Sequence, residues 1–453
     1  MCMFRFPIEK CYDEAFLTKM VDRFLSGEVR AFRELQSYYD VKTRILLRNM
    51  DEGKPNNKIA HGFARYISNM ATSYFIGKPI KYTAEDEEYQ ELLNKELENN
   101  YIGAVNYEAS KESSKKGIAF LLLFLDEGGA LRIQKCDAET VIPVYSPRLG
   151  EFLEGAVRLW DEYDIDGNLL AQNAALYDKK EVWTFKREAS SGQFRLEDVE
   201  NHMFDDIPVI VIWNNEEACG DYGPHIPLID AYDKAQSDTA NDMEYFSDAY
   251  LCIAGASELM EAAGTGTSED ADTKAADLRK NKILFLDEKG QAEWLVKNIN
   301  DTASENFKDR LYSDLFFLSQ VPALSDESFA GNLTGVAIRY KLIGLEELAI
   351  MKQSKFEAAQ KKLVKLVTEY INLKYNKNFD PETVKQKYER NFIANDEEMI
   401  NNARNLDGII SRDTQLQMLP SGIVPDSVKE KKKILEEHRE EEQRMLIDER
   451  LYE

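Results

Sequence analysis

Apolar residues recur every three or four positions in two stretches on either side of a short insert. The pattern predicts helices over residues 227–256 and 303–319. The insert contains two strand-like runs, 282–286 and 292–296. If the two helices pack antiparallel, the insert lies at the far tip of a stalk. The aspartates of the first helix do not lie among its apolar positions and are expected on the solvent-exposed surface. They are Asp230, Asp233, Asp238, Asp242 and Asp248.

The region from Gly117 to Asn214 has the pattern of strands with glycine-containing turns. Its longest apolar run, residues 118–125, predicts a buried strand. Helical patterns precede this region, so the first half of the chain is predicted to be a mixed α+β body. The helices are predicted at 9–36, 84–116 and from Pro55 to Phe75, and the strands at 118–125, 131–134, 141–145, 155–160, 174–177, 181–186 and 209–213.

A second long helical pattern follows, over residues 335–376, without a proline. About forty helical residues would span roughly 60 Å, and Gly344 could mark a kink. Residues 380–425 are predicted to form a smaller helical module. The charges of both signs in 429–453 favour a solvated terminal helix.

A polar loop framed by glycines lies between the second stalk helix and this long helix. Gly331 and Gly335 frame it, and glycine permits backbone angles closed to other residues. Asp326 and Glu327 precede them, and no lysine or arginine occurs in this loop before Arg339. Contacts of the loop with a polyanion would therefore be steric or through hydrogen bonds.

The overall charge is acidic, with 57 basic and 82 acidic residues and a net charge of -25. A sequence-specific nucleic-acid binder would carry a basic face, so this composition argues against one. No apolar run is long enough for a transmembrane helix, and residues 1–10 lack the apolar core of a secretion signal.

Residue sets that perform chemistry are not found. The four histidines have no ligand spacing, and no GxxxxGK[ST] phosphate loop occurs. Asp270 and Asp272 superficially resemble a calcium loop but lack its glycine and final glutamate. The sequence therefore predicts no enzyme activity, no cofactor and no metal.

Several blocks of the sequence resemble the phage portal proteins of the SPP1 family. They occur in matching order over roughly residues 35–420, and the loop with the start of the long helix is the most informative. The blocks are Pro55–Ile59, Tyr74–Tyr82, Ile226–Tyr250, Glu327–Leu348 and Phe356–Leu366.

The resemblance implies a homo-oligomeric ring, usually of twelve subunits and possibly thirteen, at one vertex of a bacteriophage capsid. Double-stranded DNA would pass through it without sequence specificity, packaged by a terminase and later ejected. The implied partners are the terminase, capsid and scaffolding proteins and head-completion or adaptor proteins, with no membrane. The ring would assemble in the bacterial cytoplasm and remain in the virion.

The same resemblance implies a portal-type division of the chain. It comprises a mixed α/β wing, a long-helix stem, a small α/β clip and a helical crown. The expected segments are the wing 1–226, first stem helix 227–256, clip 257–302, second stem helix 303–319, tunnel loop 320–335, long helix 336–376, crown 377–425 and charged tail 426–453.

The tunnel loop would face the DNA, with Gly331 and Gly335 as hinges. Asn332 and Gly331 could alternatively only shape the turn. Two other functions remain open from the residues alone: a metal-dependent nucleic-acid-processing enzyme built on scattered carboxylates, and a non-viral helical scaffold. The expected DNA-facing residues are Ser325, Asp326, Glu327, Ser328, Asn332 and Thr334.

Overall fold

The computed structural model of the protein contains two compact units. The first comprises Met1–Pro322 with Gly344–Arg390, and the second comprises Ala323–Ile343 with Asn391–Glu453. The residues that the structure describes are 4–51, 54–150, 152–247, 250–254, 283–286, 292–295, 301–324, 335–391, 396–419, 423–424, 427 and 429–439.

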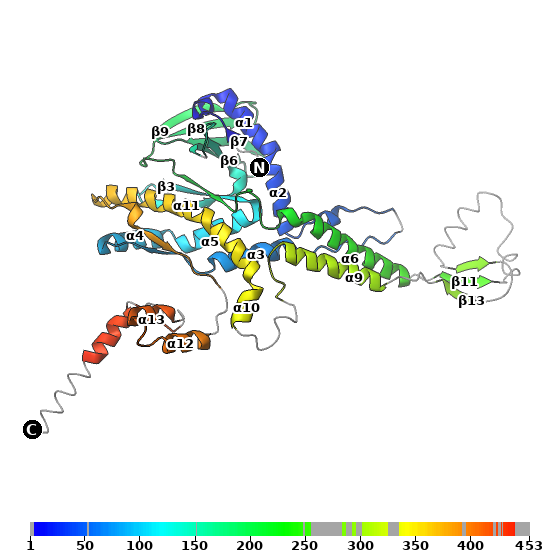
Figure 1. The fold of residues 1–453 in the computed structure, drawn as a ribbon. Coiled ribbons are helices and arrows are strands. Elements are labelled where there is room, and N and C mark those ends of the chain that lie inside the picture. Colours follow the sequence, from blue (N-terminus) through cyan, green and yellow to red (C-terminus); the bar gives the residue numbers. More distant parts are fainter. Residues whose placement is uncertain are drawn as a thin grey trace, which may run out of the picture. The chain divides into compact units, whose positions relative to one another are not determined.

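The largest sheet of the first unit has six strands in the order β1-β5-β6-β7-β8-β9 (Figure 1). Neighbouring strands are antiparallel, except that β1 pairs with β5 in parallel. Helix α1 (Glu14–Ser26) packs its apolar residues on this sheet, and the Asp13 side chain caps its start by accepting the Phe16 N–H at 2.7 Å. The strands are β1 (Phe4–Arg5), β5 (Val141–Tyr145), β6 (Leu153–Tyr163), β7 (Leu169–Tyr177), β8 (Glu181–Glu188) and β9 (Arg195–Asn201).

Strand β9 was missed by the sequence prediction. All of its residues are exposed, and it forms the open edge of the sheet. An edge strand of this kind carries charged side chains that discourage pairing with other chains. Its sequence therefore lacks the alternation of apolar and polar residues by which strands are recognised.

Strand β3 (Ile118–Leu125) separates two hydrophobic cores. It is central in the antiparallel sheet β10-β3-β4, which also contains β4 (Leu131–Cys136) and β10 (Val209–Trp213). Phe120 packs with α1 and the six-stranded sheet, whereas Leu121 packs with the helices on the other side. Since successive side chains alternate between faces, a strand buried on both faces needs apolar residues throughout. The predicted buried strand at 118–125 is confirmed.

The long helical pattern at 335–376 forms two helices, because the helix is interrupted at Leu342. Helix α10 (Gly335–Lys341) belongs to the second unit, and α11 (Ile343–Tyr375) runs into the first. The 33 residues of α11 span about 50 Å, and its buried face packs on β3 and the neighbouring helices. Those helices are α3 (Phe63–Ile76), α4 (Glu87–Asn99) and α5 (Ile102–Lys116), whereas α2 (Glu28–Tyr39) packs in the core on the other side of β3.

Helices α6 (Ile226–Ser247) and α9 (Asp301–Leu318) lie side by side (Figure 1). Contacts pair Thr239 with Ser304 and Tyr232 with Tyr312, so one helix ascends as the other descends. The two helices are therefore antiparallel, which is the arrangement that the sequence left as a condition for a stalk. The expected extent of the first helix, 227–256, was wrong.

The chain leaves the α-helical conformation after Ser247 and forms strand β11 (Tyr250–Ala254). Aromatic and β-branched residues favour a strand over a helix, and β11 gains two partners. It pairs in parallel with β12 (Ile283–Leu286) and antiparallel with β13 (Ala292–Leu295). The two strand-like runs of the insert are therefore found as strands.

The expected helical module at 380–425 begins later than predicted. Pro381–Thr383 forms a 3-10 turn, and β14 (Lys385–Lys387) pairs with β2 (Lys81–Thr83) inside the first unit. The described helices of the module, α12 (Asp396–Asn405) and α13 (Arg412–Met418), belong to the second unit. Residues 429–439 are helical.

Candidate channel segment and its anchors

The residues predicted to face DNA fall where the structure is not described. Ser325, Asp326, Glu327, Ser328, Gly331, Asn332 and Thr334 lie outside the described residues, and Gly335 is the first residue of α10. The described part of the chain instead shows how this segment is attached to the first unit, at Pro322 and Gly344.

The two attachment points lie against each other. The Tyr66 hydroxyl of α3 donates a hydrogen bond to the Pro322 carbonyl at 2.8 Å. A Cβ atom on Gly344 would lie 2.8 Å from the Gln320 carbonyl oxygen, a distance too short for a side chain. Gln320 itself has a positive φ of 58°. Gly344 therefore serves as a point of close backbone approach at the start of α11.

Aromatic rings fill the space beside the first attachment point. Phe63 and Tyr66 of α3 contact Phe316 of α9 edge-on, at centroid distances of 6.0 and 5.5 Å. Phe63 also contacts Tyr232 of α6 at 5.1 Å. Edge-to-face pairs add to the stabilisation from burial. These rings therefore fix both α6 and α9 to α3, and α9 is held in this way just before the chain enters the loop.

An extended segment lies along α6 and was not anticipated from the sequence. Pro55 was expected to open a helix, but α3 begins only at Phe63, and residues 55–61 are neither helix nor strand. We call residues 44–51 and 54–61 the strap. Its first part includes the 3-10 turn Arg44–Leu47.

The strap donates alternate backbone N–H groups to polar side chains spaced one helical turn apart on α6. The N–H of Asn57 binds Asn241 Oδ1 at 2.7 Å, and that of Ile59 binds Ser237 Oγ at 2.9 Å. The N–H of His61 binds Asp233 Oδ1 at 3.1 Å. Residues two apart in an extended chain and four apart in a helix each point the same way, which matches the two backbones. A backbone without a sheet partner is satisfied by side chains here.

Asp233 was expected on the surface, and this expectation was wrong. Its side chain is fully buried and also accepts hydrogen bonds from Thr43 Oγ1 at 2.6 Å and from the His61 ring at 2.7 Å. Buried polar groups normally have such partners. Asp238 remains half-exposed and forms an ion pair with Arg48 at 2.6 Å. A row of polar residues spaced four positions apart on a helix can therefore indicate a face that binds another segment of the chain, as well as a face in contact with water.

A buried ion pair holds α11 close to the second attachment point. Lys352 Nζ lies 2.7 Å from Asp221 Oδ2, and both side chains are almost completely buried. Asp221 also accepts hydrogen bonds from Asn214 at 2.8 Å and from Ser114 at 2.5 Å. Lys352 donates to the Asn214 side-chain oxygen as well. The pair thereby connects α11, α5 and the segment after β10.

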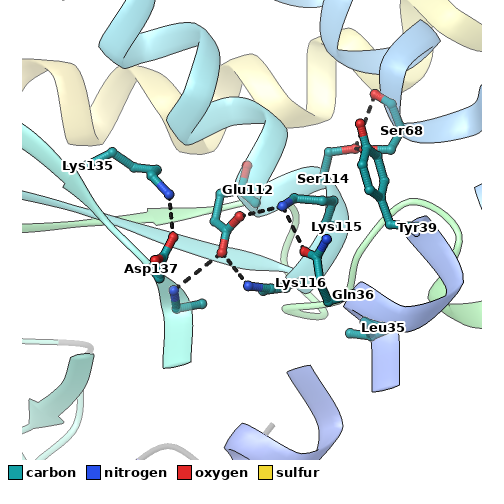
Figure 2. A network of polar contacts seen from close by, with 12 residues as sticks. Leu35, Gln36, Tyr39, Ser68, Glu112, Ser114, Lys115, Lys116, Lys135 and Asp137 are labelled. Atoms are coloured by element: carbon teal, nitrogen blue, oxygen red, sulfur yellow. Dashed lines mark hydrogen bonds and ion pairs between the residues drawn. The ribbon is translucent and has the colours of Figure 1, made fainter. Parts of the chain in front are cut away.

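A second buried network surrounds Glu112 on α5 (Figure 2). Its carboxylate lies 2.6 Å from Lys116 Nζ and 2.8 Å from Lys115 Nζ. Lys116 also pairs with Glu139 at 2.6 Å. Burial raises the pKa of Glu112, but the two lysines outweigh it and lower that pKa from 4.5 to about 2. Both networks fix the position of α5 between the sheets and α11.

Metal-binding chemistry has no visible site in the described part of the chain, where no three histidine, cysteine, aspartate or glutamate side chains gather to hold an ion. Among the described helices, none is both long and apolar enough to cross a bilayer.

Comparison with known proteins gives a family and two curated relatives. Residues 26–444 match the family described as phage portal protein, SPP1 Gp6-like. The portal protein of Bacillus phage SPP1 is 25% identical over 420 residues, which cover 89% of this chain and 80% of that protein. The portal protein of Clostridium phage phiCD119 is 23% identical over 409 residues, covering 83% and 86%.

Two solved structures of GTA particle necks also contain similar chains. One is the neck of a native GTA particle computed with C12 symmetry, with a TM-score of 0.40 and 12% identity over 79% of this chain and 90% of that chain. The other is the neck of an empty GTA particle computed with C6 symmetry, with a TM-score of 0.43 and 11% identity over 80% and 90%. Since the family match spans nearly the whole sequence, the chain belongs to the SPP1 Gp6-like family of phage portal proteins.

Proposed function

We propose that this chain is the subunit of a portal ring at one capsid vertex of a bacteriophage. Double-stranded DNA would be packaged through the ring by a terminase and later ejected through it. The observation that carries the proposal is the family match over residues 26–444. The protein would act as a structural gate and not as an enzyme, and it would remain in the virion.

The elements take the following roles in this proposal. The first unit up to β10 is the wing, α6 and α9 form the stem, and the sheet of β11, β12 and β13 belongs to the clip. The clip would contact the terminase and later the head-completion or adaptor proteins. Capsid and scaffolding proteins would surround the wing. The second unit would contain the tunnel loop, α10 and the crown.

The ring is the first prediction. Purified protein should elute as a particle of roughly 600–700 kDa by light scattering, about twelve copies of the 52.1 kDa chain. Negative-stain images should show a ring with a central hole. The same preparation should neither hydrolyse ATP nor cut DNA in magnesium or manganese.

A stable monomer at micromolar concentration and physiological salt would overturn the ring. Nuclease activity that survives repurification and is lost on changing one carboxylate would favour the metal-dependent enzyme instead.

The second prediction concerns the loop at 320–335, which we propose lines the DNA channel with Gly331 and Gly335 as hinges. Acidic and polar walls avoid trapping a polyanion, because phosphate contacts by lysine give strong, salt-dependent binding. Asp326→Lys combined with Glu327→Lys should slow DNA packaging in an extract assay, and more so at low salt.

The matched control is Glu197→Lys with Asp198→Lys, on the exposed strand β9. It makes the same change of charge and should leave the packaging rate unchanged. If the loop variant packages DNA at the wild-type rate and to the wild-type length, a different segment lines the channel.

A further inference from the structure

The helix pair of α6, with its strap, and α9 presents an exposed apolar side chain on each of its two outer sides. On the α6 side, the strap exposes Leu47 with 80% of its surface accessible. On the α9 side, Phe307 is 55% exposed. If a second protein covered these sides, the two side chains would lose apolar surface to water, which favours association.

The two sides face away from each other. Successive residues of a helix are about 100° apart, so the α6 residues that hold the strap lie about 130° around the helix axis from those that contact α9. The first set is Asp233, Ser237 and Asn241, and the second is Tyr232, Gln236 and Thr239. Two different surfaces on opposite sides suit a head-to-tail contact, which closes into a ring when copies repeat it.

The exposed groups on the two sides lie at the same level of the helix pair. On the strap, Lys58 lies between Asn57 and Ile59, which bind Asn241 and Ser237. On α9, the contacts Thr239–Ser304 and Gln236–Lys308 place Phe307 and Asp309 beside this same turn of α6. Leu47 is level with it too, because the Lys58 Nζ donates to the Leu46 carbonyl at 3.0 Å.

The charges on the two sides are opposite. Lys58 and Asp309 are both exposed, and within the described part of the chain neither forms an ion pair with an oppositely charged group. The neighbouring strap arginine, Arg48, is already neutralised by Asp238. On α9, Arg310 and Asp314 likewise pair with each other at 2.9 Å. Lys58 on the strap and Asp309 on α9 are thus both without an ion-pair partner among the described residues, and they lie at the same level.

The order of the groups around each side also agrees. On α9, Phe307 and Asp309 lie on opposite flanks, about 160° apart by helical geometry. On α6, residues 57–61 follow the row that holds the strap. The turn at 44–48 lies beside them, toward the next row around the helix, because Arg48 binds both Asp238 and the Asn57 carbonyl. Sliding one subunit sideways onto the next, with little rotation, brings Lys58 to the flank of Asp309 and Leu47 to that of Phe307.

We propose that the strap of one subunit packs against α9 of a second copy of this chain, with Lys58 beside Asp309 and Leu47 beside Phe307. This interface rests on the proposed ring and identifies the surfaces through which neighbouring subunits meet. The strap then has two tasks: its backbone is bound by α6 of its own subunit, and its side chains bind the neighbour.

The test is a reversal of the charges, with assembly followed by light scattering across a concentration series. Lys58→Asp and Asp309→Lys each place like charges together, and each should raise the concentration for half-assembly at least about fivefold. The double variant restores opposite charges and should assemble like the wild type. The effect of each single change should shrink in high salt.

Mixing the two single variants shows whether the pair joins different subunits. In an alternating ring each interface has either both reversed charges or both native ones. Every interface then joins opposite charges, so an equal mixture should recover assembly. Leu47→Asp should also impair assembly. Ile165→Asp, at the fully exposed turn between β6 and β7, is the control for a surface apolar-to-charged change.

The outcomes separate this interface from the proposed function. A wild-type protein that stays monomeric overturns the ring itself. A wild-type ring that is unaffected by Lys58→Asp, Asp309→Lys and Leu47→Asp leaves the ring in place and overturns this interface. Circular dichroism of each variant shows whether it folds, and recovery in the mixture excludes misfolding as the cause of lost assembly.

Discussion

Replacing Asp221 by alanine is expected to lower the free energy of unfolding by about 3–5 kcal/mol. The change leaves Lys352 charged in the core, with only the Asn214 side-chain oxygen as a partner. It also removes the acceptor for Ser114. Thermal and urea unfolding at matched protein concentrations would measure the loss.

A double variant, Asp221→Asn with Lys352→Met, is the informative control. It removes both charges together, so it should be less destabilising than Asp221→Ala alone. Glu85→Ala breaks an exposed ion pair with Lys385 and should have little effect. If Asp221→Ala is as mild as Glu85→Ala, the buried pair does not hold α11 to the rest of the first unit.

Acidification is expected to remove a smaller stabilisation, through the protonation of Glu112. The pKa of this carboxyl is about 2 in the folded protein, below its ordinary value of 4.5. A depressed pKa stabilises the fold fully above pH 4.5, and this contribution is lost as the pH falls toward 2. Between pH 6 and pH 3, the wild type should lose about 2 kcal/mol more than Glu112→Gln, which cannot titrate there.

The comparison of unfolding curves for the two proteins isolates this one carboxyl from the many others that titrate. Lys116→Met provides a second check. It removes the strongest cause that lowers the pKa of Glu112, so the stability of that variant should decline at higher pH than that of the wild type. If the difference in unfolding free energy between the wild type and Glu112→Gln stays constant from pH 6 to pH 3, the lowered pKa of Glu112 is contradicted.

The continuous apolar run of β3 was interpreted correctly, because a strand buried on both faces needs apolar side chains on both faces. The eight apolar residues of β3 predicted a buried strand, and the first six are buried because each face of the strand packs on a separate core. Helical patterns on either side of the insert were also found as α6 and α9, whereas their antiparallel pairing had been left open.

The burial of polar residues could not be predicted from the sequence pattern. Asp233 was placed on the surface because it lies off the apolar stripe of α6, and only the strap, distant in sequence, covers it. The prediction of a helix from Pro55 was also wrong. Proline is common at the start of a helix, but here the backbone that follows Pro55 is extended and binds α6. The predicted DNA-facing residues came from resemblance, and they remain a prediction.

The different rise per residue of the strap and of α6 limits how long the strap can follow the helix. Two extended residues advance about 6.6–6.8 Å, whereas four helical residues advance about 6.0 Å, so the two backbones lose register by about 0.6–0.8 Å per contact. The three N–H bonds lengthen along the strap from 2.7 to 2.9 to 3.1 Å, and the chain turns into α3 at Phe63. A deletion of one strap residue would turn every following N–H away from α6, so insertions and deletions should be tolerated in the neighbouring loops and excluded between Asn57 and His61.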